Sequence, residues 1–152
     1  MDAEKFLTEL ENLLKKTGVQ TATLEGVEPQ IGNTLRALLP VTDAGDMVLT
    51  EVMMGPYTED ALLLQIYTTM IAEIGPGYEA LKEMLLDWNL SAPLGAFGIY
   101  RQNRQFYHKY NYIIPTDADP EEMAAEIFYL IDLVLGVISE RFPDAVRLSG
   151  HV

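Results

Sequence analysis

The segment formed by residues 119–142 constrains the fold of this chain more than any other part of the sequence. Its start carries three helix signals, with Asp119 as an N-cap, Pro120 at the first helical position and Glu122 at capping-box spacing. On a helical wheel its apolar residues cover roughly 180°, whereas a helix lying on a core usually buries about 100°. Either a sheet curls around this helix, or a second surface such as another copy of the chain covers it. The arc is widened by Phe128, Leu135 and Phe142. These three residues are therefore the candidate dimer contacts.

The same helix defines where the domain is expected to end. Phe142-Pro143 predicts a stop near Arg141, because proline inside a helix removes a hydrogen bond and clashes with the preceding turn. Residues 147–152 are then expected to form a flexible tail. Residues 1–146 have no repeat and no long linker, so we interpret them as a single domain.

Periodicity predicts two further helices and about five strands. Apolar residues recur at helical spacing over residues 3–16, and again after Gly75-Pro76-Gly77 to about Leu90. Strand-like runs occupy residues 34–39, 47–54, 96–100 and 105–114. The run over residues 61–71 is interpreted as a strand, although its Leu and Met residues also suit a helix. Residues 19–30 are polar without clear periodicity, and this leaves the register of the first strand open.

Short spacings between the predicted strands favour antiparallel pairing. The sequence therefore predicts an α+β fold with helices packed on an antiparallel sheet of about five strands. The expected order of elements is α-β-β-β-α-β-β-α.

Charge and composition restrict the classes of partner. The formal net charge is −13, and such a field repels nucleic acids and anionic membranes. The chain has no cysteine, so disulfides and thiolate metal sites are excluded. No basic, apolar leader begins the chain and no apolar run reaches the ~18 residues of a spanning helix. We therefore expect a soluble cytoplasmic protein.

No motif predicts catalysis, a metal site or a cofactor. The two histidines are His108 and His151, and a lone histidine does not make a zinc site. His108 shares strand parity with aromatic residues, which is typical of a packed histidine. The glycines lack the phosphate-binding patterns, and the acidic residues lie at helix starts and turns. We accordingly expect a protein that is not an enzyme and binds no cofactor.

One predicted hairpin gathers basic and aromatic residues in an otherwise acidic chain. They are either a solvated hairpin tip or a contact for an anion or acidic peptide, with tyrosines supplying interface area. The candidate partner-binding residues are Tyr100, Arg101, Arg104, Tyr107, His108 and Tyr110.

The order of elements, and especially the closing segment, resembles the type III secretion chaperone-like superfamily, including its YbjN-type branch. The resemblance lies in residues 95–100, a short turn, residues 106–115 and the Asp-Pro-Glu-Glu start of the last helix. It is one of topology and pattern, and it extends over most of residues 2–142. It implies a small acidic α+β protein that forms a dimer and binds other proteins, without catalytic residues.

The leading functional hypothesis is a non-enzymatic protein-binding or chaperone-like domain with an unidentified protein or peptide partner. The alternative is a small-molecule or anion sensor, or an enzyme, that uses the cluster of Arg101, Arg104 and His108. A structural subunit of a larger assembly is a third hypothesis.

Overall fold

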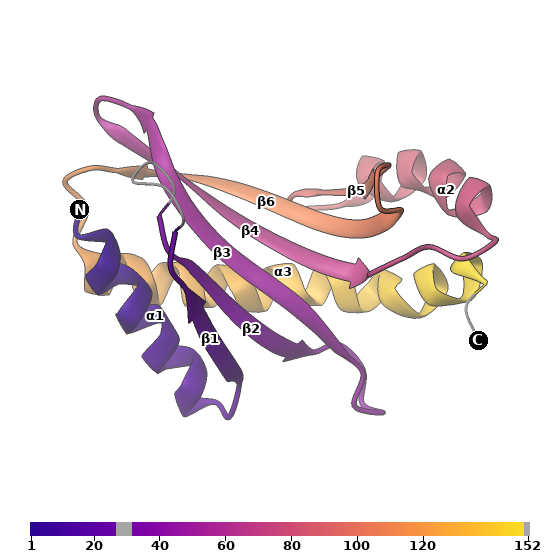
Figure 1. The fold of residues 1–152 in the computed structure, drawn as a ribbon, viewed down its shortest axis with the longest axis horizontal. Helices are drawn as coiled ribbons and strands as arrows, with labels where there is room; N and C mark the ends of the chain where they lie inside the picture. Colours follow the sequence, from indigo (N-terminus) through magenta and orange to yellow (C-terminus); the bar gives the residue numbers. More distant parts are fainter. Residues whose placement is uncertain (27–31, 151–152) are drawn as a thin grey trace.

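The computed structural model describes residues 1–26 and 32–150 of the chain. Three helices and six strands follow in the order α1 (Ala3–Lys16), β1 (Gln20–Leu24), β2 (Thr34–Pro40), β3 (Met47–Thr58), β4 (Ala61–Ile71), α2 (Tyr78–Ser91), β5 (Ala96–Tyr100), β6 (Gln105–Pro115) and α3 (Pro120–Ser149) (Figure 1). The predicted α+β class and antiparallel sheet are confirmed, and residues 61–71 form a strand. The sheet has six strands, one more than the expected number of about five.

The additional strand is β1, which lies in the polar segment 19–30. Nearly all of its side chains are exposed, so the segment lacks the alternation of apolar and polar residues that identifies a strand. The second half of that segment, residues 27–30, lies outside the described residues.

All neighbouring strands are antiparallel, in the order β1-β2-β3-β4-β6-β5. The three helices pack on one face of this curved sheet, and Figure 1 shows α3 running along its length. Trp88 of α2 contacts Phe97 and Phe106, while Tyr112 of β6 donates a hydrogen bond to Glu126 of α3 at 2.5 Å. Among residues 1–26 and 32–150, no helix lies on the opposite face of the sheet.

The start of α3 is as predicted, but its end is not. Asp119 accepts hydrogen bonds from the backbone N–H groups of Glu121 and Glu122 at 3.0 and 2.9 Å. The predicted stop near Arg141 and the tail from residue 147 are wrong, because the helix continues through Pro143 to Ser149. Residues 151 and 152 lie outside the described residues.

Burial of the last two turns explains why Pro143 does not end the helix. Phe142, Ala145 and Ser149 are buried, and their burial offsets the hydrogen bond that proline removes. Gly75 N–H donates to Ser149 Oγ at 3.0 Å, and Gly77 N–H donates to the Ser149 carbonyl at 2.9 Å. The turn before α2 therefore anchors the end of α3.

Candidate functional site

The sheet surface that faces away from the helices is here called the open face. Residues directly opposite each other on neighbouring strands point to the same side, so the register defines its members. One row across the sheet runs through Gln20, Leu38, Leu49, Thr69, Tyr107 and Gly98. The next row runs through Ala22, Arg36, Glu51, Tyr67, Lys109 and Ala96. Outside these two rows the face also includes Leu24, Thr34, Met47, Met53, Leu63, Gln65, Tyr100, Gln105, Asn111 and Ile113.

The open face differs from the rest of the molecule in its charge. It carries one of the 22 acidic residues that the structure describes, Glu51, together with Arg36 and Lys109. Arg36 Nε and Glu51 Oε2 are 3.0 Å apart on adjacent strands, so this acid is paired. The face is thus close to neutral in a chain with a net charge of −13.

Acidic residues lie instead in the connections at both ends of the strands. Asp43 and Asp46 are in the connection between β2 and β3. At the opposite ends of the strands lie Glu25, Glu59, Asp60 and Asp117. All six side chains are exposed. We call these residues the acidic rim, because they border the near-neutral face on two sides.

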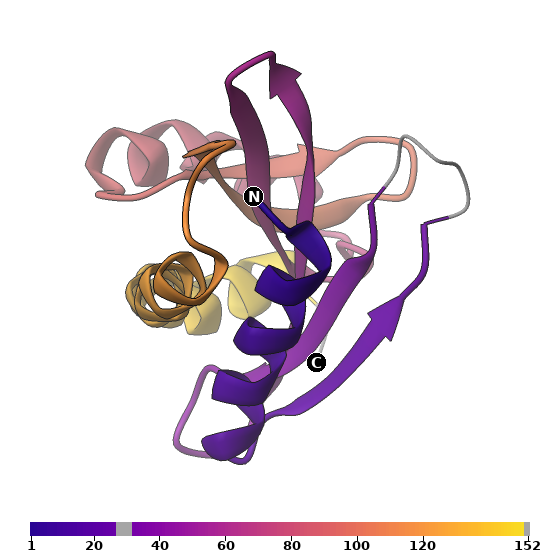
Figure 2. The same cartoon turned by 90° about the vertical axis from the view of Figure 1, so that its left-hand side faces the viewer.

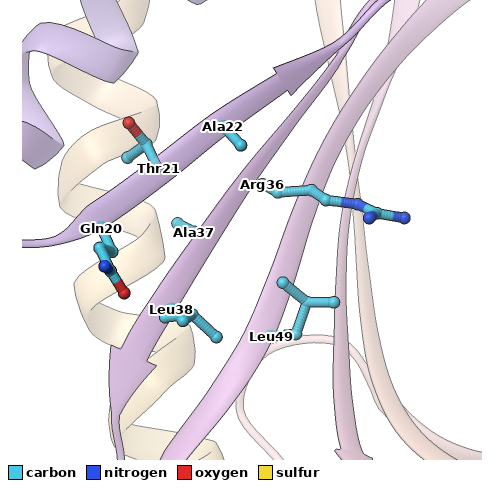
Figure 3. Close-up of a pocket in the computed structure, with 7 residues that line it drawn as sticks. All are labelled: Gln20, Thr21, Ala22, Arg36, Ala37, Leu38 and Leu49. Carbon is cyan, nitrogen blue, oxygen red and sulfur yellow. The ribbon is translucent and has the colours of Figure 1, made fainter.

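A groove of about 300 Å³ lies on the open face over β1, β2 and β3. Figure 3 shows its seven lining residues, which are Gln20, Thr21, Ala22, Arg36, Ala37, Leu38 and Leu49. The small side chain of Ala22 leaves space beside the larger Leu38 and Leu49. A second hollow of about 260 Å³, lined in part by Met53, Gly55 and Leu63, continues the surface across β3 and β4.

Tyrosines occupy the other end of the open face. The rings of Tyr67 and Tyr107 stack with centroids 4.9 Å apart, and Tyr67 donates a hydrogen bond to Gln105. Burial, reinforced by Tyr107 and Glu51, raises the pKa of Tyr67 to about 12, so its phenol stays neutral. Tyr100 lies on the neighbouring strand and is half exposed. This end offers rigid aromatic surface without charge.

The predicted hairpin cluster is divided between the two faces of the sheet. Tyr100 and Tyr107 belong to the open face, whereas His108 and Tyr110 point towards the helices. Arg101 is exposed in the turn between β5 and β6. Adjacent strand residues point to opposite faces, so a cluster that is compact in sequence does not form one binding surface.

Arg104 forms structural contacts. Its Nε donates to the Ile74 carbonyl at 3.1 Å and its Nη2 donates to the Gly75 carbonyl at 2.9 Å. The guanidinium also lies over the Tyr78 ring, 4.6 Å from the centroid. These contacts use the donors that an anion site would need.

His108 is fully buried among Phe97, Phe106 and the helices. Its Nε2 is 2.8 Å from the Leu94 carbonyl, which makes Nε2 the protonated nitrogen, and Nδ1 has no hydrogen-bond partner. Burial lowers the pKa of His108, against a smaller opposing effect of the Leu94 carbonyl. The geometry therefore does not bring Arg101, Arg104 and His108 around one ligand.

The three candidate dimer contacts on α3 do not form an exposed patch. Phe142 is buried, while Phe128 and Leu135 are half-buried and pack against the core. The wide apolar arc of α3 is covered by the curved sheet and by α1, which packs against α3. Exposed apolar residues that the sequence did not predict lie elsewhere, with Leu86 and Leu90 on α2 being 80% and 89% exposed.

Residues 1–26 and 32–150 were also compared with the geometry of metal sites and of membrane-spanning helices. No group of three or more His, Asp or Glu side chains is placed to hold a metal ion, and no helix there has the length and hydropathy to cross a membrane.

Two comparisons of the sequence, with protein-family models and with curated proteins, give no match. The resemblance to the type III secretion chaperone-like superfamily therefore stays a prediction.

Proposed function

We propose that this protein is a non-enzymatic binding protein that holds an extended segment of a partner protein across the open face of its sheet. The observation that carries this proposal is the exclusion of acidic residues from that face. Solubility explains an acidic surface, but it does not explain why 21 of the 22 acids in residues 1–26 and 32–150 avoid the broad, solvent-exposed face of the sheet. A surface kept apolar and near-neutral in this way is typical of an interaction site.

The open face suits apolar side chains. Leu24, Leu38, Met47 and Ile113 are each exposed by more than a third on this face. Covering what remains exposed of one such side chain contributes about 1 kcal/mol, since full burial contributes about 1.5–3 kcal/mol. The grooves beside Leu38 and Leu49, and beside Met53 and Leu63, give alternate side chains of an extended segment places to bind.

The acidic rim determines which charge the partner segment should carry on either side of its apolar middle. A segment that crosses the open face along the strands passes Asp43 and Asp46 at one end, and Glu59 and Asp60 at the other. Opposite charges favour encounter and fix the position of a bound chain. The preferred partner is therefore apolar in the middle and basic on both sides.

On this proposal the protein acts in a chaperone-like manner in the cytoplasm, keeping an apolar segment of its partner from contacting other chains. The resemblance of its order of elements to that of chaperone-like proteins supports this role, and the absence of cysteine suits a reducing compartment.

The test is binding of a fluorescein-labelled peptide in which alternating valine and threonine residues lie between lysine pairs, measured by fluorescence polarisation. The same peptide with glutamate in place of lysine is the control ligand. Leu49→Glu, in the middle of the open face, should weaken binding of the lysine-flanked peptide about tenfold or more, since about 1.4 kcal/mol corresponds to a factor of ten. Leu90→Glu, on the exposed face of α2, is the matched control and should bind as the wild type does.

The rim is tested separately. Glu59→Gln combined with Asp60→Asn should weaken binding of the lysine-flanked peptide and flatten its salt dependence. Failure of the wild-type protein to bind, equal binding of the glutamate-flanked peptide, or unchanged binding by Leu49→Glu would each contradict the proposal.

A further inference from the structure

The two edge strands of the six-stranded sheet, β5 and β1, differ in whether other groups bond to their outer backbone. At β5, the side chain of Asn89 on α2 forms two hydrogen bonds with the backbone of Phe97. Asn89 Nδ2 donates to the Phe97 carbonyl at 2.9 Å, and Phe97 N–H donates to Asn89 Oδ1 at 2.6 Å. An amide side chain thus takes the place of a neighbouring strand, and α2 protects this edge from pairing with another chain.

In the part of the chain that the structure describes, the β1 edge has no such protection. Apart from the ladder to β2, no hydrogen bond to the backbone of Gln20–Leu24 is formed by any group in residues 1–26 and 32–150. In Figure 2, β1 borders the sheet and no helix or strand lies beyond it. The sequence of β1 also lacks lysine, proline and any charge, which are the usual devices against edge pairing.

We propose that β1 pairs with β1 of a second copy of this chain, so that two sheets join into one antiparallel sheet across a two-fold axis. The strand is self-complementary about its centre. Ala22 would lie opposite Ala22 of the second copy, and Thr21 opposite Thr23 of the second copy. Small residues at the axis allow close approach, and cross-strand threonine pairs favour antiparallel pairing. The surface is isologous, as closed dimers require.

The distribution of charge favours a second copy over other partners at this edge. Residues 1–40 carry six acidic and four basic side chains, a net charge of −2, which leaves −11 on the remainder of the chain. Beside β1, Lys15 Nζ and Glu11 Oε1 pair at 2.7 Å, and Thr23 donates a hydrogen bond to Glu11 Oε2 at 2.9 Å. Two copies that meet through β1 therefore meet through a strand without charge, beside a Glu11 that Lys15 neutralises, despite the strong net charge of each chain.

This pairing would also place the two open faces side by side, because Ala22 and Leu24 point to that face. The inference does not require the proposed function, since it rests on the backbone of β1 and on the charge of the N-terminal region.

The test is the mass in solution, measured by light scattering and sedimentation over a wide range of protein concentrations. The wild type should have twice the 17.0 kDa mass of the chain. Ala22→Lys and Ala22→Glu each place like charges opposite each other at the axis, and each variant alone should have a mass of 17.0 kDa. A mixture of the two variants should recover the doubled mass, because lysine then lies opposite glutamate.

Ala22 is exposed, so both substitutions are compatible with the fold, which circular dichroism verifies. Leu90→Lys, on the strongly exposed face of α2, should keep the doubled mass. A wild type of 17.0 kDa at all concentrations, separate variants that keep the doubled mass, or a mixture that fails to recover it would overturn the proposal. These outcomes are independent of whether Leu49→Glu changes peptide binding.

Discussion

Gly77 lies so close to the end of α3 that a Cβ atom at this position would be 1.6 Å from the Leu148 carbonyl oxygen. The neighbouring Gly75 bonds to the Ser149 side chain, 74 residues away in sequence. The turn before α2 and the last turn of α3 are thus in backbone contact, and only glycine permits that approach.

Gly77→Ala should destabilise the protein by about 3 kcal/mol, because backbone atoms on both sides must move apart. The matched control is Gly136→Ala, at an exposed position of α3 where an added Cβ meets no atom within 4 Å. That substitution should stabilise the protein by about 0.5–1 kcal/mol, since glycine is unfavourable inside a helix. Urea unfolding of both variants is the measurement, and equal stabilities would contradict the close contact.

Asn89→Ala should destabilise the protein by about 1–2 kcal/mol, because the N–H and carbonyl of Phe97 lose their partners. It should also increase the rate of aggregation, since the freed β5 edge becomes available to other chains. Unfolding curves and light scattering on heating measure the two effects. Ser91→Ala is the control: its hydroxyl makes three long contacts, at 3.5 and 3.4 Å to the carbonyls of Asp87 and Trp88 and at 3.3 Å to the exposed Arg141 Nη2, so stability should change by less than about 0.5 kcal/mol. An Asn89→Ala variant that behaves like this control would contradict the role of Asn89 at the edge.

The elements that bury one face could be predicted from the sequence, whereas those with little burial could not. The alternation of β4 and the Asp119 cap of α3 gave correct boundaries, because each follows local rules. The exposed strand β1 carries no such pattern. The continuation of α3 past Pro143 depends on contacts of Ser149 with Gly75 and Gly77, which are distant in sequence.

The candidate site was harder to predict than the fold, and for a related reason. Tyr107 and His108 are neighbours in the chain but lie on opposite faces of β6, and Arg104 turns back to residues 74 and 75. The open face exists only once the register of six strands is known, since Leu38, Leu49 and Tyr107 come from three separate segments. The sequence contained one local sign of this face: β2 and β3 each have an apolar residue, Leu38 and Leu49, at a position that alternation assigns to the side away from the core.

The stability of the protein should depend on pH through His108. Burial lowers the pKa of His108 below its ordinary value of 6.5. The unfolded chain therefore binds a proton at a higher pH than the folded chain, and acidification favours unfolding. The stability contributed by this residue is complete above pH 6.5 and decreases as the pH falls through the window below 6.5, by up to about 1.4 kcal/mol per pH unit.

His108→Gln removes this titration while leaving an amide that can donate to the Leu94 carbonyl. Urea unfolding of the wild type and the variant between about pH 5 and pH 8 separates His108 from the carboxylates, because the carboxylates are common to both proteins. The difference in free energy of unfolding should narrow or reverse in favour of the variant as the pH falls. A difference that is constant with pH would show that His108 titrates alike in both states.

Thr50 and Thr68 form a buried polar pair beneath α3, with Oγ1 atoms 2.8 Å apart and with relative exposures of 2% and 0%. Thr50→Val or Thr68→Val alone leaves one buried hydroxyl without its partner and should cost about 1–3 kcal/mol. The double variant replaces both hydroxyls by methyl groups of the same shape, so it should be close to the wild type in stability. A double-mutant cycle by urea unfolding should therefore give a coupling energy of about 1 kcal/mol or more. If the two single effects simply add, the hydrogen bond between the threonines does not stabilise this part of the core.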